Sequence, residues 1–266
     1  MSDSTFASSI RLFEILHSLP EIMKEGDSIK PSMSAEEDTA SSIGQRLAAF
    51  TQKCREFETS LKEWYGELEW RYQTTHRHSQ PWTELPSRDS QTGDTAKSKV
   101  QLYWFEPSTL YSLLEPDSLA RIFPLFICFV NPDVAFQVVE HWTGLLLMYS
   151  TLHMAQTRLR SHEDNQSPPQ INNSTFTSNP RTLALLIAQS LEYFVHPDMG
   201  LLGTNIIGFP LSVAQGYFQH TGAVEVLWFD VIFERITALR SGLRGFLDDM
   251  AKGNTVKLVR PWNRSP

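Results

Sequence analysis

Residues 43–68, with the sequence IGQRLAAFTQKCREFETSLKEWYGEL, decide the fold class of this chain. Apolar residues recur there at alternating spacings of four and three, the heptad pattern of a helix with one narrow apolar face. They are Ile43, Leu47, Phe50, Cys54, Phe57, Leu61, Trp64 and Leu68. No proline interrupts the pattern, so we expect one helix over about residues 35–73, with an apolar stripe ~40 Å long.

Two interpretations of this stripe are possible. It can cover the core of its own domain, or it can form a coiled coil that makes the chain a homodimeric scaffold. Phe50, Phe57 and Trp64 are bulky for a tight two-stranded seam, which prefers Leu, Ile and Val. The pattern therefore favours packing within the chain.

Helical periodicity continues on both sides of this stretch. Only residues 100–105 indicate a short extended piece or an anchor on the core. The other helices are expected at about residues 4–24 (broken near its end by Pro20 and Gly26), 108–114, 117–129, 132–159, 180–195, 204–219 and 223–250. The predicted fold class is all-α, a helical bundle or hairpin array of about seven to nine helices with long polar loops.

Changes in composition suggest four segments. Residues 1–74 hold the N-terminal helices, including the heptad-patterned one, and residues 75–99 form a polar linker rich in Pro, Ser and Thr. Residues 100–250 form the larger helical domain. Residues 251–266 form a basic tail, which is either solvated or a contact for nucleic acid or a partner. Its basic residues are Lys252, Lys257, Arg260 and Arg264.

Composition excludes several classes of protein. The chain has 266 residues, 41% of them hydrophobic, which is too apolar for a disordered protein. Its net charge of −7 does not suit a general nucleic-acid binder. Cys54 and Cys128 are expected to be buried free thiols, and two cysteines cannot build a cysteine-rich zinc site. We see no secretory signal or membrane span, and expect a soluble intracellular protein.

No motif predicts catalysis, so no catalytic, cofactor-binding or metal-ligating residue is assigned, and the chain is not expected to be an enzyme. Gly203 and Gly208 have the spacing of a phosphate loop but lack its Lys and Ser/Thr. The His76-x-His78 pair has no ligand neighbours in the sequence. His141 and His153, on one predicted helix, differ by roughly 120° in direction and cannot share a metal.

Two carboxylates lie near apolar helix faces. Glu192 and Glu225 are expected to make structural pairs with Arg181, Arg235 or a helix N-terminus rather than to act as acids or bases. Aromatic residues concentrate at 103–105, 123–149 and 217–233. We interpret them first as a core and second as the lining of an apolar pocket for a small molecule, as a small helical enzyme or ligand-binding protein would have.

The C-terminal half resembles a known family. The residues that carry this resemblance are IAQSLEYF at 187–194, DMGLLG at 198–203, Pro210-Leu211, Ala214, Phe218, Glu225 and Trp228. They are preceded by Phe136, His141-Trp142 and the three leucines at 145–147. In this order they resemble the closing segment of fungal-specific transcription-factor domains, the all-helical regulatory regions that follow a zinc binuclear cluster. The resemblance covers roughly residues 100–245. We therefore expect Met199 to Gly203 to form a turn between two helices, and Trp228 to act as a plug at the interface between the last helices.

The resemblance implies a regulatory function without a DNA-binding element. The family's zinc cluster needs six cysteines, and this chain has two. The expected protein is therefore a nuclear transcription regulator without specific DNA binding of its own, with a secondary-metabolite pathway as one setting. Its expected partner is a zinc-cluster transcription factor or a second copy of itself, and a small-molecule effector is a further option. Target genes, the sign of regulation and the true start of the protein stay open.

Overall fold

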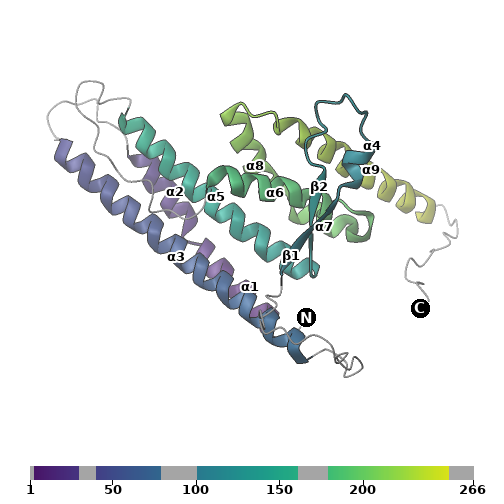
Figure 1. Ribbon diagram of the computed structural model, residues 1–266, viewed down its shortest axis with the longest axis horizontal. Helices are drawn as coiled ribbons and strands as arrows, with labels where there is room; N and C mark the ends of the chain where they lie inside the picture. Colours follow the sequence, from purple (N-terminus) through teal and green to yellow (C-terminus); the bar gives the residue numbers. More distant parts are fainter. Residues whose placement is uncertain (1–2, 30–39, 79–100, 161–178, 252–266) are drawn as a thin grey trace, which may run out of the picture.

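The computed structural model describes residues 3–29, 40–78, 101–160 and 179–251, which form a mostly helical molecule (Figure 1). The elements in chain order are α1 (Asp3–Leu16), α2 (Leu19–Ser28), α3 (Ala40–His78), β1 (Tyr103–Pro107), α4 (Thr109–Leu113), β2 (Leu125–Phe129), α5 (Pro132–Arg160), α6 (Pro180–Phe194), the 3-10 turn η2 (Pro197–Met199), α7 (Gly200–Ile206), α8 (Gly208–Thr221) and α9 (Val226–Ala251). The predicted all-α class is confirmed, with the addition of a two-stranded sheet.

The heptad-patterned helix is α3, and its stripe is buried within its own chain. Helices α1, α2 and α5 pack against it (Figure 1). The seven stripe residues from Leu47 to Leu68 are buried, and Ile43 is partly buried against the same core. This packing removes the apolar stripe from solvent, as the intramolecular interpretation requires. The helix also continues to His78, so residues 75–78 of the expected linker are helical.

The expected single helix over residues 4–24 is two helices. The chain turns at His17 and Ser18, and Pro20 lies in the first turn of α2, where its missing N–H costs nothing. Gly26 does not end α2 but lies buried inside it. A Cβ atom at Gly26 would stand 2.4 Å from Thr151 Cγ2 of α5, so this glycine permits the close approach of two helices.

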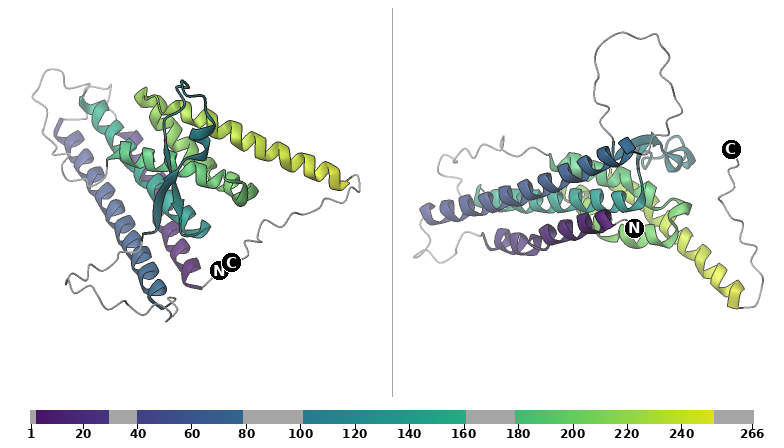
Figure 2. Two further views of the ribbon diagram at one scale, coloured as in Figure 1. Left: turned by 45° about the vertical axis from the view of Figure 1, so that its right-hand side comes forward. Right: turned by 90° about the horizontal axis from the view of Figure 1, so that it is seen from below.

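The second departure from expectation is the β-hairpin. The extended piece expected near residue 100 is β1, but the helix expected at 117–129 is wrong, because residues 125–129 form β2. The strands are antiparallel, with Tyr103 opposite Phe129 and Pro107 opposite Leu125. Figure 2 shows the hairpin lying across the helices, and β2 packs on α5 and α6. A short apolar run such as LFICF fits a buried strand as well as a helix, so periodicity cannot decide between them.

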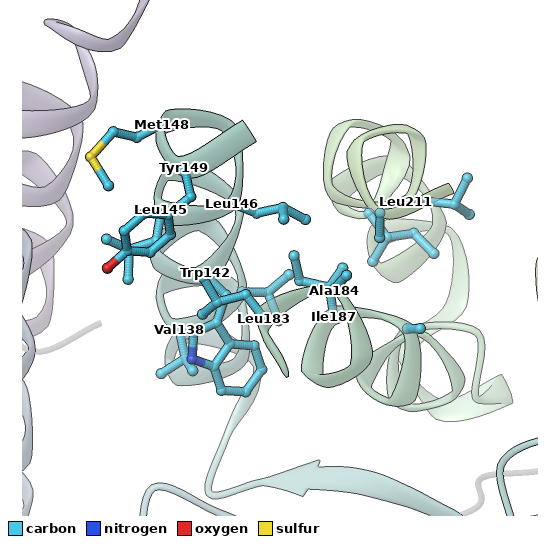
Figure 3. Packing of buried hydrophobic residues seen from close by; sticks show 14 of the residues in the cluster. Val138, Trp142, Leu145, Leu146, Met148, Tyr149, Leu183, Ala184, Ile187 and Leu211 are labelled. Carbon is cyan, nitrogen blue, oxygen red and sulfur yellow. The ribbon is translucent and has the colours of Figure 1, made fainter. Parts of the chain in front are cut away.

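The C-terminal helices pack on the other side of α5. Side chains of α5, α6 and α8 meet in the core, among them Trp142, Leu183, Ile187 and Leu211 (Figure 3). The helix expected at 204–219 is divided at Ile207 into α7 and α8. Helix α9 begins in this core and extends beyond it (Figures 1 and 2).

Apart from Phe126 and Cys128, the buried apolar residues of the described region form one cluster, which runs from Leu12 in α1 to Ile236 in α9. Positions 79–99 of the expected linker and positions 252–266 of the expected tail lie outside the described residues. Among the described helices, none is long and apolar enough to cross a membrane.

Candidate functional site

Glu192 accepts four hydrogen bonds from a segment distant in sequence. It belongs to α6, and only 2% of its surface is exposed. One carboxylate oxygen accepts from the Ser108 hydroxyl (2.5 Å), and the other accepts from the N–H (2.7 Å) and hydroxyl (2.7 Å) of Thr109 and from the N–H of Leu110 (3.1 Å). These donors surround the N-terminus of α4, where a negative charge is favoured. The expected pairing of Glu192 with a helix N-terminus is confirmed.

Glu225 makes the other expected structural pair. Its carboxylate accepts from the Arg181 guanidinium, which joins the first turn of α6 to the residue just before α9. Glu225 is buried and Arg181 is half exposed. The Arg181 backbone is held by Asn179, whose side chain caps α6 by accepting from the Arg181 N–H at 2.9 Å. The pair therefore ties two helix starts together.

Trp228 also connects separate elements. Its indole N–H donates to the Ala188 carbonyl of α6 at 3.1 Å. Its ring meets the edge of Phe123, just before β2, with centroids 5.5 Å apart. Trp228 is fully buried, as expected of a plug, but its hydrogen-bond partner is α6 rather than a neighbouring last helix. This contact anchors the start of α9 to the hairpin side of the molecule.

Residues 199–203, expected to form a turn between helices, are instead the last residue of η2 and the first four residues of α7. Gly200 has a positive φ of 53°, a conformation that side-chain-bearing residues rarely adopt. Gly203 must be a glycine because of the space around it: a Cβ atom there would lie 2.0 Å from the Phe194 carbonyl oxygen. The passage from α6 through η2 into α7 thus depends on both glycines. Gly208 begins α8 and has open space around it, so it takes no part in the close packing.

A polar and aromatic cluster lies between α3 and α5. The His141 ring stacks on Tyr65 (centroids 5.0 Å) and lies 5.5 Å from Trp64. Its Nδ1 atom has no hydrogen-bond partner among the described residues, and burial lowers the pKa of His141 to about 3. His141 is thus a buried neutral ring.

Glu140, adjacent to His141, is a titratable group that the sequence reasoning missed. Burial raises the pKa of its carboxyl group to about 7, so both Glu140 and His141 favour their neutral forms. The sequence did hold a signal for this, because Glu140 follows the apolar residue Phe136 by four residues and therefore lies on the same side of the helix. Phe136 itself contacts Phe13 of α1.

The remaining residues singled out by sequence are not brought together. Cys54 and Cys128 are buried and free, as expected, and burial raises the pKa of each thiol to about 12. His76 and His78 fall in the last turn of α3, while His153 is exposed on α5. Within the described ranges, no group of three His, Cys, Asp or Glu could hold a metal ion.

The aromatic concentrations contact one another. Tyr103 meets the Trp142 ring edge-on at 5.2 Å, Phe129 meets Tyr193 at 5.2 Å, and Phe218 lies 6.0 Å from Phe229. These rings fill the space between the hairpin and helices α5 to α9, which is the core interpretation. Comparison of the chain with protein-family models, curated proteins and solved structures finds no match.

Proposed function

We propose that this chain is a regulatory domain like those of fungal transcription factors, which acts through protein contacts and lacks a DNA-binding zinc cluster. The observation that carries the proposal is the ordered set of motif residues from Ile187 to Trp228, together with the small number of cysteines. In this function the domain is nuclear and binds another regulator, either a zinc-cluster protein or a second copy.

The contacts of the motif residues support a scaffold rather than a catalytic centre. Glu192 holds the N-terminus of α4, Glu225 holds Arg181, and Trp228 holds Ala188. Gly203 allows α7 to approach Phe194. Glu192, Glu225 and Trp228 each join elements distant in sequence, so the motif supports the formation of one helical arrangement. A regulatory domain requires such an arrangement in order to present a surface to partners.

A reporter assay tests the proposal. The full chain is fused to a heterologous DNA-binding domain and expressed in a fungal host with a matching reporter gene. We expect reporter expression to differ several-fold from that of the DNA-binding domain alone. The Glu115→Lys variant, changed at an exposed residue, should behave like the parent chain. Glu192→Lys, which removes the buried acceptor, should lose the effect.

Two results would contradict the proposal. One is a reporter that does not respond to the fusion while the fused chain is present and folded by limited proteolysis. The other is tight, sequence-specific binding of the purified chain alone to promoter DNA, measured by fluorescence anisotropy against a scrambled duplex. Such binding would place base recognition in a chain proposed to lack it.

A further inference from the structure

An apolar surface lies where α1 packs on the first turns of α5. Phe13 of α1 contacts Phe136 of α5, with ring centroids 5.9 Å apart. Ile10 precedes Phe13 by three residues and therefore lies on the same side of α1. Ile10 is 43% exposed and Phe13 is 48% exposed, although both are large apolar side chains. These neighbours present a continuous apolar surface to solvent, which is more than a single exposed side chain.

The Glu140 carboxyl group adjoins this apolar surface. Glu140 follows Phe136 by one helical turn, so the two side chains are neighbours on α5. Gly144, one turn further, lies against α1, because a Cβ atom there would stand 2.5 Å from Leu16 Cδ2. Glu140 thus lies between two positions at which α5 contacts α1. Its side chain is partly buried, and no described residue donates a hydrogen bond to it or forms an ion pair with it.

The charged side chains on the elements around α5 leave this carboxyl group unpaired. On α1, Arg11 is bound to Glu67 of α3, while Glu14 and His17 are exposed. Residues 200–219 of α7 and α8 and all of β2 carry no charged side chain. On α2, α3 and α6, several charged side chains are engaged with other residues, namely Glu25, Asp27, Lys53, Glu58, Lys62, Arg181 and Glu192. Burial is accordingly the cause of the raised pKa of this carboxyl group.

Glu140 differs in this respect from the other carboxylates of the core. Glu192 accepts hydrogen bonds from the N-terminus of α4, and Glu225 is paired with Arg181. Removing a carboxylate from water is costly unless a hydrogen bond or an opposite charge compensates for it. Glu140 is therefore an acceptor that the described part of the chain does not use, beside apolar side chains that are open to solvent.

We propose that Ile10, Phe13, Phe136 and Glu140, called here the α1–α5 strip, bind an arginine or lysine side chain of a partner protein together with the apolar residues beside it. The cationic group pairs with the Glu140 carboxylate, and the nearby rings of Phe13 and Phe136 favour a cation. Apolar residues of the partner cover Ile10 and Phe13. This inference rests on the proposed function, since it gives the protein contacts a surface and a partner chemistry.

Two tripeptide amides probe the strip on the full chain. One has arginine between two leucines, and the other has citrulline in its place, which keeps the shape of arginine without its charge. At pH 8 Glu140 is mostly ionised, and we expect the arginine peptide to bind about fivefold more tightly than the citrulline peptide. At pH 6 most Glu140 carboxyl groups are protonated, so the arginine peptide should bind about threefold more weakly than at pH 8.

Nuclear magnetic resonance locates the contact. The amide signals of α1 give the dissociation constant of each peptide. In protein labelled with ¹³C at the glutamate carboxyl groups, the Glu140 signal is assigned by its loss in Glu140→Gln, and its titration gives the pKa of Glu140. The arginine peptide should lower this pKa, because a cation stabilises the ionised form. The citrulline peptide carries no charge and should not lower it.

Two matched variants make the test specific. Glu140→Gln removes the charge and should bind the two peptides equally at pH 8. Glu14→Gln removes an exposed carboxylate that is adjacent to Phe13 in the sequence, and should keep the preference of the parent chain for arginine. Circular dichroism and urea unfolding show whether both variants keep the fold of the parent chain.

Equal binding of the two peptides to the parent chain at pH 8 would overturn the proposal. A preference for arginine that survives in Glu140→Gln would overturn it too, by placing the cation elsewhere, as would a Glu140 pKa that the arginine peptide leaves unchanged. None of these measurements uses the reporter gene. A responsive reporter together with any of these negative results would therefore reject the α1–α5 strip and keep the regulatory function.

Discussion

Single residues carry much of the specificity of this fold, and Glu192 is the clearest example. A carboxylate that accepts four hydrogen bonds in a buried position cannot be replaced by an uncharged group of the same shape without loss. Its partners at residues 108–110 lie more than 80 positions earlier in the chain. One side chain thus fixes how the segment after β1 meets α6.

The Glu192→Gln substitution tests this role. We expect it to lower the free energy of unfolding by about 2 kcal/mol, because an amide loses the charge and presents a donor to the donors of residues 108–110. Urea unfolding followed by circular dichroism gives the value. The matched control Glu115→Gln changes an exposed carboxylate and should stay within about 0.5 kcal/mol of the parent. Equal stability of the two variants would contradict the role.

Glu140 makes stability depend on pH. Its folded pKa is raised from 4.5 to about 7, so the folded state keeps a proton that the unfolded state releases. The stabilisation is complete below about pH 4.5 and is lost as the pH rises through about 7. Glu140→Gln cannot ionise, so at pH 8 it should be more stable than the parent by about 1–3 kcal/mol. Thermal unfolding at pH 5 and pH 8 compares the two, and an unchanged pH profile would disprove the burial of this carboxyl group.

His141 acts with the opposite sign. The pKa of His141 in the folded state is lowered from 6.5 to about 3. Between these pH values the unfolded state binds a proton that the folded state does not bind. The stabilisation is complete above about pH 6.5 and is lost as the pH falls through about 3. His141→Phe keeps a ring against Trp64 and Tyr65 and removes the titrating nitrogens. We expect this variant to lose less stability than the parent between pH 6.5 and pH 4, as measured by urea unfolding at each pH.

At the scale of elements, glycines decide how closely segments approach. Gly203→Ala forces a methyl group into the Phe194 carbonyl, a backbone atom that cannot rotate away, and should destabilise the protein by more than about 2 kcal/mol. Gly216 lies in α8 with open space around it, so Gly216→Ala should stabilise by about 0.5–1 kcal/mol. Differential scanning calorimetry of both variants gives the two signs, and a stable Gly203→Ala would contradict the close contact.

The elements also show what local pattern can and cannot predict. The capped start of α6 at Asn179-Pro180 and the uninterrupted α3 follow from local chemistry, so sequence predicts them well. Strand β2 and the turn between α1 and α2 do not. The first depends on pairing with β1, about 20 residues away, and the second places a proline where a helix begins rather than where it ends.

At the scale of the whole molecule, the N-terminal helices and the C-terminal half share one core. Among the N-terminal helices, Trp64 connects α3 to α1, because its indole N–H donates to the Ser8 carbonyl at 3.0 Å. The stripe on α3 is therefore a structural seam between helices of one chain. Weakening it should weaken the entire molecule and not only its N-terminal part.

Leu61→Ala tests this cooperativity. Leu61 is fully buried, and its truncation should cost about 2–5 kcal/mol in a single transition that tryptophan fluorescence and circular dichroism report alike. Leu113→Ala, at a leucine that is 77% exposed, should cost less than about 0.5 kcal/mol. Two separate transitions in the parent chain would show that the halves unfold independently. If Leu61→Ala dissociated a dimer without loss of stability, this would support the coiled-coil interpretation of the α3 stripe.

The sequence by itself determined the helical class, the long stripe, the capped start of α6 and the structural nature of Glu192 and Glu225. These depend on periodicity, on capping chemistry and on the cost of burying a charge, all of which act over short distances or follow from residue type. Only the tertiary structure decided what the α3 stripe covers, that residues 125–129 are a strand, and that Glu140 is partly buried next to the buried His141. Those outcomes depend on which segments far apart in the chain exclude water together, and no local pattern records that choice.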